Sequence, residues 1–351
     1  MCNAVRSGQL KLTESGVGES LHCFSGNSRG EKMKADSVNK KNSQVLGKRL
    51  VRDWNLNKWK YAMIVPVLIY LAFFCYKPMY GLIVAFKDYK LTRGIGGSGW
   101  ADPWYKWFAS FVSDPYFPRV LKNTFLISAL TILFGFPAPI LLALLINEVR
   151  NGIFKRMVQT ITYMPYFISL VVMCGIINVF CKQDGLFSQI AVLFGGAAQN
   201  YLANPKYFRT VYVLSDIWQK IGWDSIIYLA ALAGIDQEQY EAARVDGANR
   251  FRQMVYITLP GLMPTIMILF ILRMGNILNV GYEKILLLYN ASTYEVADVI
   301  STYTYRLSFP ASGTPMYSKS TAIGLFNTLV NVFFLLVTNA ISKKSTKSGL
   351  F

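Results

Sequence analysis

Residues 121–146 read LKNTFLISALTILFGFPAPILLALLI, and apart from Lys122 this stretch contains no charged side chain. A helix that crosses the hydrocarbon core of a bilayer needs about 20 consecutive, mostly apolar residues. No water is available there to satisfy the backbone, so a crossing segment must pair its own N–H and C=O groups, as a helix does. The stretch therefore predicts a membrane-spanning helix.

Five further stretches of the chain have the same character. The whole chain is 53% hydrophobic, with a mean hydropathy of +0.32, which is too apolar for an ordinary soluble domain. We expect an all-α, polytopic membrane protein with about six transmembrane helices. The predicted spans cover residues 61–86, 121–146, 157–180, 210–234, 262–282 and 321–341. An even number of spans places both termini on the same side of the membrane.

Much of the formal charge of +17 lies near the N-terminus. Residues 1–55 are basic, rich in Ser, Asn and Gly and without apolar periodicity, and they predict a disordered cytoplasmic tail. A misplaced start site is the alternative origin for part of this tail. The dense basic flank at residues 48–60 favours the cytoplasmic side and contact with anionic lipid over nucleic-acid binding. Residues 56–345 then form the transmembrane domain, and residues 346–351 form a short cytoplasmic tail.

This orientation assigns the connecting segments to the two sides of the membrane. Both termini and the segments at residues 147–156 and 235–261 are expected in the cytoplasm. The outward loops are residues 87–120, 183–209 and 283–320.

The sequence lacks the patterns of a catalytic or metal-binding protein. Its single histidine, His22, excludes a His-based triad or a multi-histidine metal site, and its five cysteines form no CxxC pair. The glycines at residues 94–99 have G-x-G-x-x-G spacing but follow no predicted strand, and residues 47–48 lack the rest of a phosphate loop. We expect no catalytic residue, metal or cofactor in this chain.

The most informative polar segment is EAARVDGANRF at residues 241–251, followed by ITLP at residues 257–260. Its first residues favour helix, Gly247 interrupts the helix, and a second helical stretch begins at Asn249 and ends at Leu259-Pro260. Small residues at the break let another protein approach closely, and charged residues around it provide contacts. A solvated helical hairpin at the membrane surface explains the same residues equally well.

This segment resembles the EAA loop of ATP-binding-cassette (ABC) importer permeases, in which Glu-Ala-Ala is followed by Gly and then by Ile-x-Leu-Pro. The form Asp246-Gly247-Ala248 resembles the sugar branch that includes the maltose-type permeases. Residues 218–235 and 275–284 are similar to the LplB-type polysaccharide permeases. The resemblance covers about residues 55–345, and the leading tail has no counterpart in it.

The resemblance implies a type I ABC importer permease fold in a bacterial cytoplasmic membrane, and a transport subunit rather than an enzyme. It implies that residues 236–260 carry a coupling helix that docks on one of two cytoplasmic ATPases, which hold the ATP and Mg. Other implied partners are a second homologous permease, membrane lipid and an extracytoplasmic solute-binding protein that delivers an oligo- or polysaccharide. A non-sugar solute or a secondary transporter are the alternatives. The implied coupling residues are Glu241, Ala242, Ala243, Asp246, Gly247, Ala248, Leu259 and Pro260.

Polar groups within the predicted spans are costly in lipid, so they are candidates for a substrate path. Asp216, Lys220 and Asp224 recur at i, i+4 and i+8 on one face of the fourth span, where Lys220 can pair with either acid. Such pairing serves either the structure alone or the lining of the path. Aromatic rings suit sugar faces and amides suit hydroxyls, although Asn also bonds helix to helix. The candidates are Trp218, Trp223, Asp224, Asn276, Asn279 and Tyr282.

Overall fold

The computed structural model describes residue 54, residues 56–346 and residues 349–350. The predicted tail at residues 1–55 therefore lies outside the described residues except for Trp54, and the predicted tail at residues 346–351 is described only in part. The chain divides into two compact units, Met1–Pro78 and Met79–Phe351.

The described part of the first unit is one apolar helix. It begins at Leu56 and contains the π-helical turn η1 (Leu71–Tyr76). The same helix continues through α2 (Lys77–Met79) and the 3-10 segment η2 (Tyr80–Phe86) into the second unit. The continuous helix Leu56–Phe86 matches the first predicted span.

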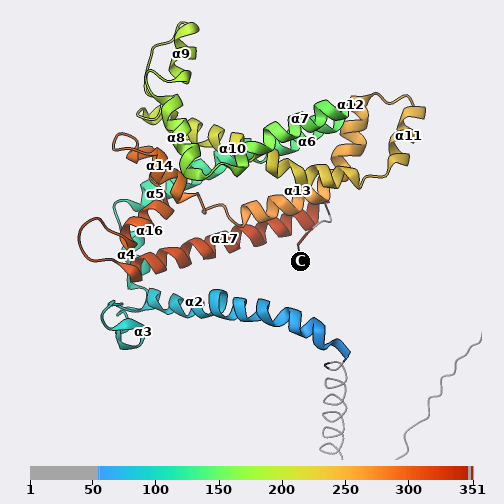
Figure 1. Cartoon of the computed structure of the whole chain (residues 1–351). Helices are drawn as coiled ribbons and strands as arrows, with labels where there is room; N and C mark the ends of the chain where they lie inside the picture. Colours follow the sequence, from blue (N-terminus) through green and yellow to red (C-terminus); the bar gives the residue numbers. More distant parts are fainter. Residues whose placement is uncertain (1–53, 55, 347–348, 351) are drawn as a thin grey trace, which may run out of the picture. The chain divides into compact units, whose positions relative to one another are not determined.

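The remaining elements belong to the second unit (Figure 1). Its α-helices are α3 (Gly94–Gly97), α4 (Lys106–Val112), α5 (Phe117–Leu130), α6 (Pro137–Glu148), α7 (Gly152–Tyr163), α8 (Leu170–Cys181), α9 (Leu186–Leu193), α10 (Pro205–Ala233), α11 (Gln237–Val245), α12 (Arg250–Gln253), α13 (Leu259–Met274), α14 (Tyr282–Leu288), α15 (Tyr294–Ala297), α16 (Ile300–Ser308) and α17 (Tyr317–Thr346). Three short segments of other helical type connect them: η3 (Thr131–Gly135), η4 (Met164–Phe167) and η5 (Met254–Thr258).

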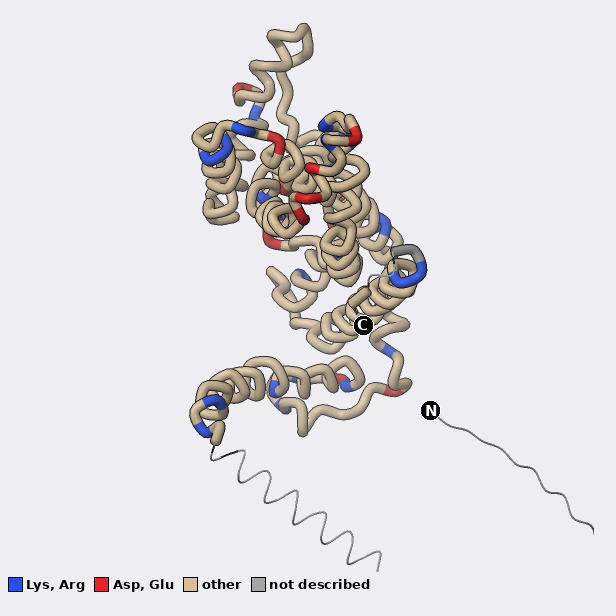
Figure 2. Tube along the Cα trace, turned by 90° about the vertical axis from the view of Figure 1, so that its right-hand side faces the viewer, with Lys and Arg blue, Asp and Glu red and all other residues tan. Residues whose placement is uncertain are grey.

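The all-α membrane class is confirmed. Among the described residues, five helices are long and apolar enough to cross a membrane: Leu56–Phe86, Phe117–Glu148, Leu170–Leu193, Arg250–Met274 and Tyr317–Lys344. The fourth predicted span, residues 210–234, corresponds to α10, a helix of 29 residues whose charged side chains keep it out of this set. Long stretches of the trace carry no Lys, Arg, Asp or Glu (Figure 2).

The predicted third span, residues 157–180, is wrong in its first half. The chain forms α7 and then η4 there, and the spanning helix begins only at Leu170. Pro165 has no N–H to donate, Ile168 is extended with ψ 131°, and the Ser169 hydroxyl caps α8 by accepting from the Val172 N–H at 3.4 Å. The apolar composition runs through this break without a change, so hydropathy alone does not reveal it.

The predicted fifth span is shifted toward the N-terminal side, into the segment at residues 235–261. It was expected to reach residue 282, but α13 ends at Met274, and turns occupy residues 275–281 before α14. The predicted helix end at Leu259-Pro260 is also wrong, because η5 leads directly into α13. Pro260 lies inside the continuous helix Arg250–Met274, and the π-helical turn η5 just before it changes the hydrogen-bond register where the proline N–H is missing.

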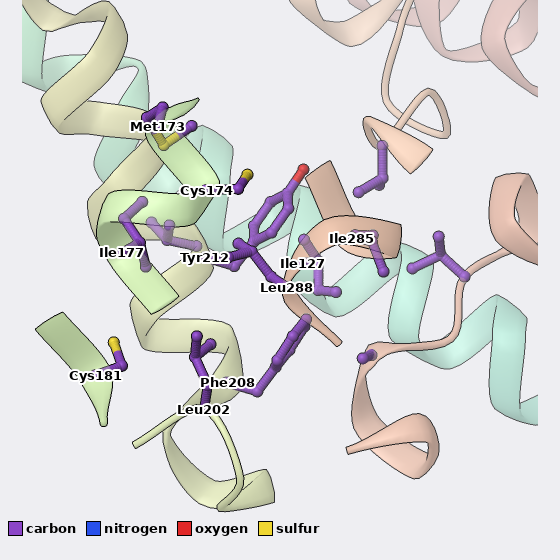
Figure 3. Packing of buried hydrophobic residues seen from close by; sticks show 14 residues of the cluster. Ile127, Met173, Cys174, Ile177, Cys181, Leu202, Phe208, Tyr212, Ile285 and Leu288 are labelled. Carbon is purple, nitrogen blue, oxygen red and sulfur yellow. The ribbon is translucent and has the colours of Figure 1, made fainter. Parts of the chain in front are cut away.

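Helix α10 packs at the centre of the second unit, against α6, α7 and α13 among others. Tyr212 and Phe208 of α10 lie in a buried cluster with Met173 of α8 and Ile285 of α14 (Figure 3). On another face, Gly222 permits a close crossing with α7, since a Cβ built there would lie 2.1 Å from the Thr162 carbonyl oxygen. Both contacts fix the position of the charged face of α10.

Ionic contacts hold α16 in place at the end of the unit away from α11 (Figure 1). The Asp114 carboxylate accepts hydrogen bonds from Lys319 and Tyr303, each at 2.6 Å. Burial by itself raises the pKa of Asp114, but these hydrogen bonds outweigh it and hold the pKa below its ordinary value. In the last turn of α16, Arg306 donates to both carboxylate oxygens of the fully buried Asp298, which lies just before the helix, at 2.7 and 2.6 Å. These bonds make α16 a fixed support.

Candidate functional site

The segment at residues 236–260 folds as a helix, a break at Gly247 and a second helical stretch, as the sequence predicts. Asp236 caps α11 by accepting from the Glu238 N–H at 3.0 Å, and Asn249 caps α12 by accepting from the Arg252 N–H at 2.9 Å. Between them Gly247 has φ +75°, a left-handed conformation that favours glycine. A Cβ built on Gly247 would meet no atom within 4 Å. The glycine is therefore needed by the backbone, and the space around it is open to another protein.

The rest of the chain covers little of helix α11. None of its residues is buried, and the apolar side chains of Val245 and Phe251 are 89% and 68% exposed. The expected coupling residues Glu241, Ala242, Asp246 and Gly247 are also exposed, and Ala243 and Ala248 are half-buried. Exposed apolar groups beside small residues form a surface suited to a protein contact.

Specific contacts connect this segment to the spanning helix α13. The Tyr240 hydroxyl lies 3.0 Å from the hydroxyl of Thr258, which is 2% exposed. A Cβ on Gly261 would lie 2.7 Å from Ile235 Cδ1, so the chain just before α11 also packs on the start of α13. The expected residues Leu259 and Pro260 begin α13 itself. They are therefore part of the connection and not of the exposed helix α11.

A polar cavity of about 500 Å³ lies among the helices at the other end of α13. A second cavity of about 360 Å³ shares part of its wall, at Asp216, Lys220, Arg273 and Asn276. The first cavity is lined by residues of α10, α13, α14 and the turns at 276–281, with contributions from α5, η3, η4 and α8. A cavity that carries polar and charged groups between apolar helices is a typical site for a hydrophilic solute.

Asp216 is the electrostatic centre of the first cavity. Its Oδ1 accepts from Lys220 Nζ at 2.8 Å and lies 3.5 Å from Lys284 Nζ. Lys284 is only 3% exposed, donates to the Tyr212 carbonyl at 3.1 Å, and lies 4.6 Å from the centre of the Tyr212 ring. The i, i+4 pair of Asp216 with Lys220 is therefore present, and the structure adds a second ammonium group to it.

The structure brings together some of the six path candidates. Asn276, Asn279 and Tyr282 line the first cavity, and Asp224 lines the second. Trp223 lines neither cavity but stacks on Tyr166, a residue of the first, with ring centres 4.6 Å apart. These five residues come from α10, the segment between α13 and α14, and the first position of α14.

Trp218 lies away from both polar cavities. It lines a mainly apolar cavity of about 600 Å³ with residues of α8, α9 and α10, including Phe180, Phe187 and Leu214. Trp218 follows Asp216 by two positions, which is about 200° around a helix, so the two side chains point to opposite faces. Trp218 was a candidate because it is close to Asp216 in sequence, but its side chain faces the apolar cavity.

Sequence reasoning missed Lys284 and Tyr166 as cavity residues, and it left the role of Asp216 open between pairing and lining of the path. Lys284 was assigned to an outward loop, because the fifth span was expected to end just before it. Arg273 is noticeable in the sequence as a basic residue of the apolar fifth span, and it lines both cavities.

Residues 135–346 match the profile of the family described as "Binding-protein-dependent transport system inner membrane component". The chain is 42% identical over 296 residues to Protein LplB of Bacillus subtilis (strain 168), covering 84% of this chain and 92% of that protein. It is also 42% identical over 305 residues to the polygalacturonan/rhamnogalacturonan transport system permease protein YteP of the same organism, with 87% and 94% covered.

Solved structures show the same fold. One match is a chain in the crystal structure of a bacterial alginate ABC transporter in complex with an alginate pentasaccharide-bound periplasmic protein. It has a TM-score of 0.78 and 42% identity, covering 86% of this chain and all (100%) of that chain. A chain of a bacterial ABC transporter involved in import of the acidic polysaccharide alginate matches with a TM-score of 0.76 and 41% identity, with 85% and 99% covered.

Proposed function

Because this chain belongs to the family of binding-protein-dependent transport system inner membrane components, we propose that it forms part of the path by which an ABC importer takes up oligo- or polysaccharides. The chain is a membrane-spanning permease subunit of such an importer. Its relatives include proteins named for polygalacturonan, rhamnogalacturonan and alginate transport.

The observation that carries the proposal is the polar cavity between α10, α13 and α14. Asn276 and Asn279 present amide groups to it, and Tyr282 presents an aromatic ring. Amides can exchange hydrogen bonds with sugar hydroxyls, and the ring can cover an apolar sugar face. Asp224 extends the polar lining into the adjoining cavity. A saccharide therefore finds both of the contact types that it needs within the membrane.

The exposed surface around Gly247 supports docking of a cytoplasmic ATPase on α11. Glu241, Ala242, Ala243, Asp246, Gly247 and Ala248 form this surface, and Leu259 and Pro260 join it to α13. ATP and Mg belong to two such ATPase subunits, and this chain binds neither. A second permease, membrane lipid and an extracytoplasmic solute-binding protein complete the importer. Residues 56–345 form the permease domain in a bacterial cytoplasmic membrane, with both termini in the cytoplasm.

The test is Gly247→Trp in the assembled importer, reconstituted in vesicles with its solute-binding protein. An indole at Gly247 fills the open space, so we expect saccharide-stimulated ATP hydrolysis and uptake to fall to background while the permease still inserts and folds. Gly195→Trp is the matched control, because Gly195 also has a positive φ (+81°) and open surroundings. Gly195→Trp introduces a similar backbone strain at a position far in sequence from the proposed ATPase contact, so it separates strain from loss of docking.

Normal stimulation in Gly247→Trp removes α11 as the ATPase contact. The wild-type importer tests the substrate class separately. If phosphate, a polyamine or a peptide stimulates the wild-type importer and no oligosaccharide does, the saccharide function is wrong even though the permease role stands.

A further inference from the structure

Three aromatic side chains follow one another from the polar cavity to the end of α16. Tyr282 lines the cavity, and its ring stacks on that of Tyr305 with centres 5.5 Å apart and an interplanar angle of 26°. The Tyr305 ring is followed by that of Phe309 at 5.4 Å. Tyr305 and Phe309 are four positions apart, so they lie on one face of the helix and its end. We call Tyr282, Tyr305 and Phe309 the aromatic row.

The aromatic row does not belong to the hydrophobic core. Its members are 38%, 39% and 65% exposed, in chain order. The opposite face of α16 does pack inside: Tyr303 is 7% exposed and donates to Asp114 at 2.6 Å. Helix α16 thus has one face that is buried for stability and another that leaves large apolar rings uncovered. A continuous exposed apolar surface of this kind marks a binding site.

The surroundings of the row favour a saccharide over lipid as the occupant. At its inner end, Tyr282 shares the cavity with Glu283, Lys284 and Asn279, and lipid tails do not enter a wall of charged and amide groups. Asn279 Nδ2 donates to Asn276 Oδ1 at 3.0 Å. In the part of the chain that the structure describes, Asn279 Oδ1 receives no hydrogen bond from another residue. That oxygen is free to accept from a hydroxyl.

The row is also held rigidly. The bidentate contact of Arg306 with Asp298 and the hydrogen bond of Thr302 to the same carboxylate at 2.7 Å fix the backbone that carries Tyr305 and Phe309. Rigid aromatic groups bind with little loss of rotamer freedom, so such a row is preorganised for a ligand that presents repeated apolar faces. Successive sugar rings of one chain present such faces.

We propose that the aromatic row is an outer saccharide subsite, which holds the sugar units that follow the unit in the cavity. The inference rests on the proposed saccharide function and adds a length preference to it. A disaccharide reaches the cavity without using the row, whereas a longer chain occupies both. The row therefore makes the importer select oligosaccharides by length.

The experiment uses the complete importer in vesicles and labelled galacturonate disaccharide, tetrasaccharide and octasaccharide as probes. Tyr305→Ala and Phe309→Ala each remove one ring, and we expect about a tenfold lower uptake of the octasaccharide at limiting concentration. Disaccharide uptake stays unchanged. Tyr305→Phe and Phe309→Tyr keep a ring and restore octasaccharide uptake. Phe194→Ala is the control, since Phe194 is an 87% exposed aromatic residue outside the row.

The remaining outcomes overturn the proposal in different ways. Equal uptake at every length in both alanine variants means that the row binds no sugar. Equal losses at every length, with a weaker response to the solute-binding protein, identify the row as the docking surface of that protein. Loss of the assembled complex on size-exclusion chromatography identifies it as a contact with the second permease. A wild-type importer that transports none of the three probes contradicts the saccharide function itself.

Discussion

At the scale of single residues, Asp216 is the cavity residue whose loss we expect to destabilise the protein most, because two lysines pair with it. It balances two ammonium groups, and one of them, Lys284, has a side chain that is only 4% exposed. Removing one partner of a buried ion pair leaves an uncompensated charge, which costs about 3–5 kcal/mol. We therefore expect Asp216→Asn to lower the thermal unfolding midpoint of the purified complex markedly.

The control for this prediction is Glu148→Gln, because Glu148 and Arg250 pair at 3.2 Å with side chains that are 41% and 53% exposed. An exposed pair contributes at most about 1 kcal/mol, so this midpoint should scarcely move. Adding Lys284→Met to Asp216→Asn removes the stranded charge and should recover part of the stability. Equal midpoints for Asp216→Asn and Glu148→Gln contradict the assignment of Asp216 as the centre of the cluster.

The same cluster shows what the sequence can and cannot predict about the site. The pair of Asp216 and Lys220 follows from their i, i+4 spacing within one helix, and it is confirmed. Lys284 is 68 positions from Asp216, and the two meet only because α13 ends at Met274 and the chain turns back before α14. No periodicity within one helix encodes that meeting. Trp218 shows the opposite case. It is close to Asp216 in sequence, but it lies on the other face of α10 and lines neither polar cavity.

At the scale of elements, the connection between α11 and α13 is the route that the proposed coupling role requires for movement to reach the cavity. The sequence predicts the break at Gly247, because glycine interrupts a helix, but it predicts an end at Pro260 that does not exist. The π-helical turn η5 keeps the helix continuous, so one helix reaches from the α11–α12 segment to Arg273 at the cavity. A displacement of α11 therefore acts on the cavity wall through one spanning helix.

The hydrogen bond between Tyr240 and Thr258 is the polar contact that ties α11 to the start of that helix. We expect Tyr240→Phe to weaken coupling, with saccharide uptake per ATP hydrolysed falling roughly two- to tenfold, the range that corresponds to losing one hydrogen bond. Basal ATP hydrolysis and assembly should persist, because the ring still packs. Thr258→Val should have the same effect, and Thr258→Ser should not.

Tyr256→Phe is the matched control for this change. Tyr256 lies in the same segment, is 76% exposed, and loses the same hydroxyl group. If Tyr240→Phe and Tyr256→Phe give the same uptake per ATP as the wild-type importer, the hydrogen bond of Tyr240 with Thr258 has no role in coupling. In that case α11 moves α13 through other contacts.

At the scale of the whole molecule, the apolar spans predict the membrane class correctly, but the cavity shows that this chain is one part of an assembly. Only 17% to 33% of the most apolar window is buried in each of the four spanning helices of the second unit. Lipid can cover exposed apolar side chains. Lipid cannot cover the exposed polar groups of Arg273, Asn276 and Asn279, because an ionised or amide group in hydrocarbon costs several kcal/mol or needs a partner.

Another protein subunit must therefore close this side of the cavity, and we expect a second six-span permease to do so. An affinity tag on this chain should recover that permease and two ATPase subunits in mild detergent, with mass spectrometry identifying each. Vesicles that contain this chain alone should show no saccharide uptake, because its sequence has no nucleotide-binding motif and its cavity wall is incomplete. Adding the missing subunits should restore ATP-dependent uptake. A purified homodimer of this chain that transports saccharide without them would show that the polar wall is closed by a second copy, and that the energy for transport comes from another source.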